Sequence, residues 1–138
     1  MKNDIQSKAK ERGQSMVELA LTITILMVLL AGTIDFGRAF FTWLEMRDAA
    51  QEGASFGSIC PDDTTEMEAR VRENLNPVYT YGVSINIPDS SITEPITVTV
   101  NTNLPLTTPF LGTILGSQTI TIRATINDNI LTSECPPP

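Results

Sequence analysis

The spacing of hydrophobic and polar positions changes along this chain, and the first distinct pattern is an uncharged run. Sixteen residues from Leu19 to Ile34 carry no charge, and Met16 and Val17 extend the apolar character to the other side of Glu18. As a helix at 1.5 Å per residue the run covers about 24 Å, compared with about 30 Å for the hydrocarbon core of a bilayer. The pattern predicts a membrane-spanning helix that needs its flanks, Glu18 included, to reach both interfaces.

The segment after the run continues a helical pattern. We expect an apolar stripe with Phe36, Phe40, Trp43 and Ala50 on or near it, and with the polar residues Asp35, Arg38, Thr42, Glu45 and Asp48 mostly off it. Phe40, Phe41 and Trp43 suit the outer interface of a membrane, and Asp35 and Arg38 stand three residues apart and can pair. The prediction is one helix from about residue 14 to about residue 56, half in lipid and half beyond it.

Glycine and proline at Gly53, Gly57 and Pro61 are expected to end that helix. Asp63 and Glu66 then have the spacing of a capping box, which predicts a short helix through about residue 75, before Asn76-Pro77.

Three later segments alternate with a period of two: residues 82–88, 96–102 and 118–127. Their β-branched residues predict an antiparallel sheet with one apolar face and one threonine-rich face. The outer half of the long helix is the expected cover for the apolar face, which gives an α+β fold. Residues 104–117 are apolar but broken by proline and glycine, so we expect a loop or a single helical turn whose leucines are either core or a contact surface; residues 132–138 are expected to form an irregular tail.

Charge is distributed unevenly over the chain. Residues 1–13 carry a net charge of +2 within a total of −7, and no lysine follows Lys10. Basic residues beside a span favour the cytoplasmic side, so the acidic remainder is expected outside the membrane. The arginines of that part form no basic cluster, which argues against nucleic-acid binding.

Cys60 and Cys135 are the only cysteines. In an exported domain two thiols favour a disulfide over a metal site, and closing a loop of this length would contribute roughly 4 kcal/mol in the chain-entropy model. Two unpaired thiols and an intermolecular bond are the alternatives.

The sequence offers little catalytic chemistry. It contains no histidine, which is the commonest general base, and no phosphate-binding glycine loop after a strand. Calcium binding by Asp62, Asp63, Glu66 or Glu68 is the weaker alternative to capping by Asp63, because no loop of spaced oxygen ligands is present. We therefore expect neither an enzyme nor a cofactor.

The basic start, the apolar run and Glu18 together resemble a known signal. An ordinary secretory signal is cut after its apolar core, whereas here the small residue beside the basic block is Gly13, before the core. This arrangement resembles the class III signal of type IV pilins, in which a prepilin peptidase cuts after glycine and the fifth mature residue is glutamate. If Gln14 is the first mature residue, Glu18 is the fifth. The strings RGQSMVELAL and DFGRAF resemble in particular the TadE-like minor pilins (pseudopilins) of the tight-adherence pilus system, over roughly residues 10–57.

The resemblance implies three regions: a cytoplasmic leader over 1–13, a transmembrane and extended helix over 14–57, and an extracytoplasmic α+β domain over 58–138. It implies cleavage between Gly13 and Gln14, a role for Glu18 in processing or assembly, and partners that include a prepilin peptidase, other pilin subunits, the Tad assembly platform and membrane lipid. The implied location is the cytoplasmic membrane, with the domain outside, and the cell surface or pilus after assembly.

Two alternatives stay open. The chain departs from many type IV pilins in having glutamine instead of phenylalanine at the first mature position. The new α-amine of Gln14 on a neighbouring subunit could neutralise the Glu18 carboxylate, but an N-terminal glutamine can cyclise and lose this amine. In one alternative, Glu18 is an interfacial acid at the end of an ordinary signal anchor, and the protein is an uncleaved, signal-anchored binding module. A membrane-tethered enzyme would require an acid pair in a cleft, which the sequence does not reveal.

Overall fold

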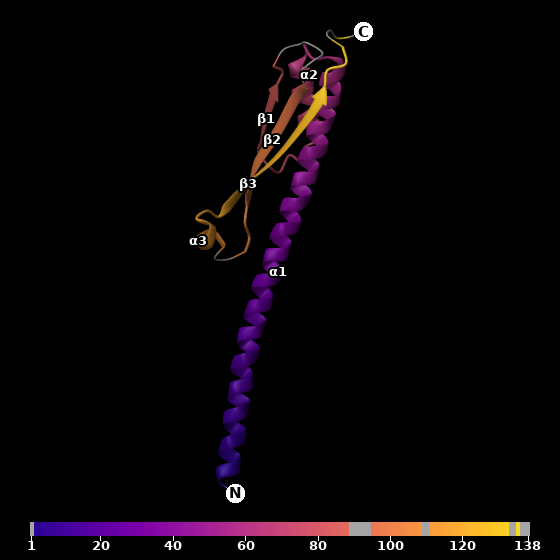
Figure 1. Cartoon of the computed structure of the whole chain (residues 1–138). Coiled ribbons are helices and arrows are strands. Elements are labelled where there is room, and N and C mark those ends of the chain that lie inside the picture. The colour runs from indigo at the N-terminus through magenta and orange to yellow at the C-terminus, as the bar shows by residue number, and fades with distance from the viewer. Residues whose placement is uncertain (1, 89–94, 109–110, 133–134, 136–138) are drawn as a thin grey trace.

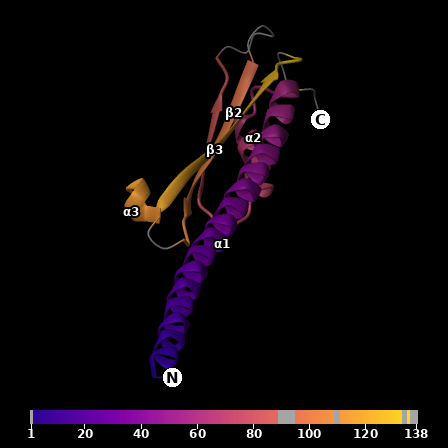
Figure 2. The same ribbon diagram turned by 60° about the horizontal axis from the view of Figure 1, so that its bottom comes forward.

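The computed structural model describes residues 2–88, 95–108, 111–132 and 135, the first twelve of them as backbone only. A single long helix, α1 (Lys2–Ile59), runs the length of the molecule, and the remaining elements gather along its C-terminal half (Figures 1 and 2). The helix continues through residues 13 and 14 without interruption and ends three residues later than expected. The α+β fold, with its long N-terminal helix and small sheet, is the one that the sequence predicts.

A short helix, α2 (Thr64–Glu73), packs beside the end of α1. Its N-cap is Asp63, whose Oδ1 accepts a hydrogen bond from the Glu66 N–H at 3.0 Å, as the capping-box spacing predicts. Pairs of opposite charge one turn apart, Arg70 with Glu66 and Arg72 with Glu68, add support on its exposed face. The helix ends two residues before Leu75, the expected end.

Three strands form an antiparallel meander in the order β1-β2-β3. They are β1 (Tyr81–Asn86), β2 (Pro95–Pro105) and β3 (Thr119–Asn129). Val83 pairs with Val100, and Val100 pairs with Ala124 on the other side, so the apolar positions of all three strands share one face. β2 and β3 extend beyond the C-terminal ends of the expected segments, 96–102 and 118–127.

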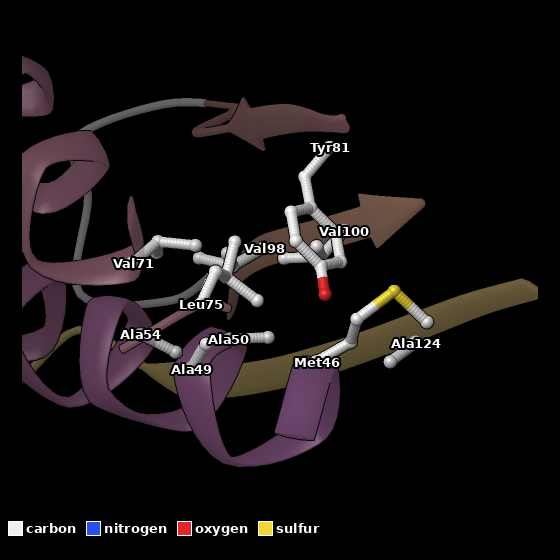
Figure 3. Packing of buried hydrophobic residues seen from close by; sticks show 10 residues of the cluster. All are labelled: Met46, Ala49, Ala50, Ala54, Val71, Leu75, Tyr81, Val98, Val100 and Ala124. Atoms are coloured by element: carbon white, nitrogen blue, oxygen red, sulfur yellow. The ribbon is translucent and has the colours of Figure 1, made fainter. Parts of the chain in front are cut away.

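The apolar face of the sheet packs against the outer half of α1, which confirms the expected cover. The core is a cluster from α1, α2 and the sheet, shown in Figure 3: Met46, Ala49, Ala50, Ala54, Val71, Leu75, Tyr81, Val98, Val100 and Ala124. Small residues on α1 allow close approach, and a Cβ on Gly53 would stand 2.4 Å from Cγ2 of Val71. The closest approach of the helix to its domain is therefore made through alanine and glycine, while Trp43 and Phe56 pack at the edges of the core.

The expected stripe on α1 is wrong at two of its aromatic members, whereas the third, Trp43, packs against the core. Phe36 and Phe40 are 72% and 46% exposed, whereas Asp35 and Thr42 are buried. The packed face runs through positions 35, 42, 46, 49, 50, 53, 54 and 57, which places the aromatic residues 36, 40 and 41 on the outside of the helix. Because the buried face begins with two polar residues, Asp35 and Thr42, a pattern based on hydrophobicity does not identify it.

The connection between β2 and β3 contains one short helix, α3 (Leu111–Leu115), as the expected single turn. Leu104 and Leu106 are buried, whereas Leu115 is exposed, so the two alternatives for these leucines each hold for part of the segment. Pro109 and Phe110 lie outside the described residues, as do most residues of the expected tail. The end of the sheet that carries α3 diverges from α1 (Figures 1 and 2).

Candidate functional site

The first half of α1 is the candidate site, because nothing in the described part of the chain covers it. From Gln14 to Leu30 every residue is exposed, and the segment is apolar and long enough to cross a membrane by length and composition. Figure 1 shows this half projecting alone from the folded domain. An uncovered face of this size and apolarity indicates a membrane anchor.

The polar residues within the apolar run satisfy their own hydroxyl groups. Thr22, Thr24 and Thr33 each donate a hydrogen bond to the backbone carbonyl four residues earlier, at 2.8–2.9 Å. A hydroxyl bonded in this way presents no unpaired donor to hydrocarbon. These threonines are therefore compatible with a lipid environment.

Glu18 differs from the threonines, because its carboxylate has no partner among the described residues. It is exposed on the helix, four residues after Gln14, and only its backbone carbonyl is used, by Thr22. Gly13 and Gln14 lie one turn below it in continuous helix. The three sequence-predicted residues therefore share one short stretch of α1, far from the folded domain.

Asp35 follows the apolar run and is the buried charge that sequence reasoning placed incorrectly. Its Oδ2 accepts hydrogen bonds at 2.7 Å from both the N–H and the hydroxyl of Thr108. The Thr107 N–H donates to both oxygens at 3.0 Å, and the Thr107 hydroxyl also donates to Oδ1. The expected pair with Arg38 is present but long, at 3.7 Å.

Opposing effects act on the pKa of Asp35. Burial raises the pKa of this carboxyl group, but the hydrogen bonds from the side chains and backbone of Thr107 and Thr108 outweigh it and hold the pKa well below its ordinary value. The hydrogen bonds of the folded protein therefore stabilise the ionised carboxylate of Asp35. Asp35 ties the connection after β2 to the base of the outer half of α1, across 72 residues of sequence.

A second acid, Glu45, performs a similar role higher on the helix. Its Oε1 accepts hydrogen bonds from the Asn76 N–H and, at 3.5 Å, from the Tyr81 hydroxyl. Burial, together with the neighbouring Glu45, raises the pKa of Tyr81 to about 12. Glu45 therefore fixes both the end of α2 and the start of β1 to α1.

The C-terminal end of α1 is closed by the residues after β3. The Leu131 N–H donates to the Ser58 carbonyl at 2.7 Å, and the Thr132 hydroxyl donates to the Ile59 carbonyl at 2.6 Å. These bonds satisfy carbonyls that the last turn of a helix leaves unpaired. Next to them a disulfide joins Cys60 and Cys135, so the ends of α1 and of the described chain are linked covalently.

Comparison with known proteins addresses the helix and not the sheet. No curated protein and no solved structure matches the chain. Residues 13–55 match the family model described as TadE-like protein, a range that begins at Gly13, includes the bare apolar half and Asp35, and ends within the packed half of α1. The match and the apolar helix together support a pilus-related, single-pass membrane protein. Over residues 13–55 this chain is similar to the TadE-like family, which confirms the resemblance inferred from its sequence.

Proposed function

We propose that this protein is a structural, pilin-like subunit of a tight-adherence pilus, processed by a prepilin peptidase after Gly13. Residues 1–13 are the cytoplasmic leader, residues 14–57 the transmembrane and extended helix, and residues 58–138 the extracytoplasmic domain. After cleavage the subunit waits in the cytoplasmic membrane and then joins other pilin subunits at the Tad assembly platform. It works in adhesion and has no catalytic role.

The observation that carries the proposal is Glu18, whose carboxylate has no partner among the described residues, on a bare apolar helix. A carboxylate in the hydrocarbon region costs about 2.5–3.5 kcal/mol on insertion scales, so a partner would lower the energy of the assembled state. The new α-amine of Gln14 on a neighbouring subunit is a partner of suitable charge. Pairing between subunits would set the register of one helix against the next.

The domain on the outer half of α1 supports the same function. The bonds of Asp35 and Glu45 and the disulfide hold the domain at several heights along the helix. A force applied to the domain would therefore pass into α1 rather than separate the two. This is a useful property for a subunit of an extracellular filament.

Cleavage is tested by intact mass and N-terminal sequencing of the membrane-extracted protein, made with and without a prepilin peptidase. We expect a peptidase-dependent start at Gln14, as glutamine or its cyclised form, and no cleavage in a Gly13→Val variant. Retention of residues 1–13 in both preparations would instead indicate the signal-anchored binding module.

The role of Glu18 is tested by Glu18→Ala, with Glu18→Gln to separate charge from hydrogen bonding. Both variants should enter the membrane, as shown by resistance to alkaline extraction, but should be lost from sheared pili detected by immunoblot. Glu52→Ala is the matched control, because Glu52 is an exposed acid on the outer half of α1. Normal incorporation of Glu18→Ala would rule out the pairing.

One observation favours the alternative of a binding module. The outer face of the sheet carries aligned polar residues, with Thr99 and Thr125 3.1 Å apart and Thr121 donating to Asn103 at 2.7 Å. Such a hydrogen-bonded polar face suits contact with a polar surface. In a pilus subunit it would contact the adhesion target or a neighbouring domain, so the fate of the leader decides between the two functions.

A further inference from the structure

A groove runs along α1 where the apolar run ends, and no role has been assigned to it so far. One hollow of about 420 Å³ is lined by Ile34, Gly37, Arg38 and Phe41 at its lower end and by Glu45 and Tyr79 at its upper end. A second hollow, of about 640 Å³, shares Arg38 and Tyr79 and continues to Asn101 and Asn103 on β2. The groove is therefore apolar toward the membrane half of α1 and polar toward the sheet.

The position of Arg38 matches the headgroup layer of a bilayer. It lies four residues after Ile34, which corresponds to about 6 Å along the helix. The headgroup region adds about 5–8 Å on each side of the hydrocarbon core. If residues 16–34, about 29 Å of helix, span the hydrocarbon core, the Arg38 side chain is at the level of the headgroups, whereas the exposed Ile34 and Phe41 border lipid and headgroup.

The charges around the groove leave Arg38 available to an anion. Asp35 is held by Thr107 and Thr108, and its closest oxygen to Arg38 is 3.7 Å away. Glu45 stands about 10 Å farther along the helix and is engaged by Asn76 and Tyr81. The guanidinium group is one-third exposed and has five N–H donors in a plane, a geometry that suits the oxygens of a phosphate.

We propose that this groove binds one glycerophospholipid of the outer leaflet, with its phosphate at Arg38 and its glycerol and upper acyl chain against Ile34, Gly37 and Phe41. The proposal goes beyond pilus assembly and requires only that α1 spans the membrane, so it stands or fails independently of leader cleavage. A bound lipid would set the depth of the subunit before assembly and keep the sheet upright on the membrane.

Gly37 allows a test that leaves every charge in place. A Cβ at Gly37 meets nothing within 4 Å, so a side chain can be introduced at this position, and a leucine there would occupy part of the groove. Gly32 is equally open but lies on the apolar run, outside the groove, and Gly32→Leu is the matched control. Arg38→Gln removes the phosphate ligand, and Arg47→Gln is its control, an exposed arginine on the same helix that stacks over Trp43.

The experiment titrates dihexanoyl phosphatidylglycerol into the isotope-labelled full chain in maltoside micelles and follows backbone amide signals. We expect saturable shifts at residues 37–41 and 79–82, loss of saturation in Gly37→Leu, and a Kd about tenfold higher in Arg38→Gln, since hydrogen bonds to charged groups contribute about 1.5 kcal/mol or more. Gly32→Leu and Arg47→Gln should bind within about twofold of the wild type.

Several results would overturn the proposal. Absence of saturable shifts, equal effects of each variant and its control, or the same shifts with inorganic phosphate alone would exclude a lipid site. The amide signals of Thr107 and Thr108 show whether the Arg38→Gln variant keeps the contacts of Asp35. If those contacts are lost, the Gly37→Leu variant, which changes no charge, decides the test.

Discussion

The two halves of α1 belong to one continuous helix, but they are stabilised by different surroundings. Residues 14–34 are mostly apolar and exposed, whereas the half from Asp35 to Ile59 packs one face against α2 and the sheet. The first half depends on membrane or on other subunits, and the second half depends on its own domain. The boundary is sharp because Asp35 directly follows the last residue of the uncharged run. Substitutions in the two halves should therefore have effects that are separable by measurement.

The disulfide should contribute the largest stabilisation of the outer half. The paired substitutions Cys60→Ser and Cys135→Ser remove a link between residues 75 apart, and loops of this order lose about 4 kcal/mol of unfolding free energy in the chain-entropy model. Urea unfolding in micelles, followed by fluorescence of the single tryptophan, Trp43, measures the change. The reduced wild type should behave like the double variant, and equal stability of oxidised and reduced protein would contradict the prediction.

Removal of the Asp35 carboxylate should have the next largest effect. Asp35→Ala leaves the N–H and hydroxyl groups of Thr107 and Thr108 without their acceptor, and breaking a buried charged contact of this kind costs about 3 kcal/mol. The same urea titration applies, with Asp48→Ala as the control because Asp48 is an exposed acid on the same helix. A loss below about 0.5 kcal/mol in both variants would show that Asp35 does not hold the domain.

Met46 and Phe40 test which face of the outer half carries the core. Met46 is fully buried and Phe40 is 46% exposed, although the aromatic ring is the larger side chain. Met46→Ala should lower the unfolding free energy by about 2 kcal/mol or more, whereas Phe40→Ala should change it by less than about 0.5 kcal/mol. A larger loss of unfolding free energy in Phe40→Ala than in Met46→Ala would show that the stripe predicted from hydrophobicity carries the core.

These residues also show how far the sequence could predict the structure. Alternation of period two was sufficient for three strands and their shared apolar face, because β-branched residues mark that face directly. The roles of Gly13 and Glu18 stay predictions. The uncharged run was evident because it is defined by neighbours in the sequence. The burial of Asp35 was not, since its donors lie 72 and 73 residues away and a helical pattern treats aspartate as solvent-facing. The sequence signals for this burial were a charged residue directly after the apolar run and the adjacent threonines Thr107 and Thr108.

The smallest expected effect is a pH dependence that separates the carboxylate from the shape of Asp35. Because the pKa of Asp35 is lower in the folded protein than in the unfolded chain, its charge stabilises the fold above the unfolded value near 4, and this contribution is lost as the pH falls toward the folded pKa. Titration of one carboxyl group can change the free energy of unfolding by at most about 1.4 kcal/mol per pH unit. Unfolding free energies of the wild type and Asp35→Asn, measured from pH 7 to pH 3, should differ by a constant amount down to about pH 4 and then converge. Other carboxyl groups titrate in both proteins and cancel in the difference. A difference that stays constant down to pH 3 would mean that the threonines recognise the shape of residue 35 and not its charge.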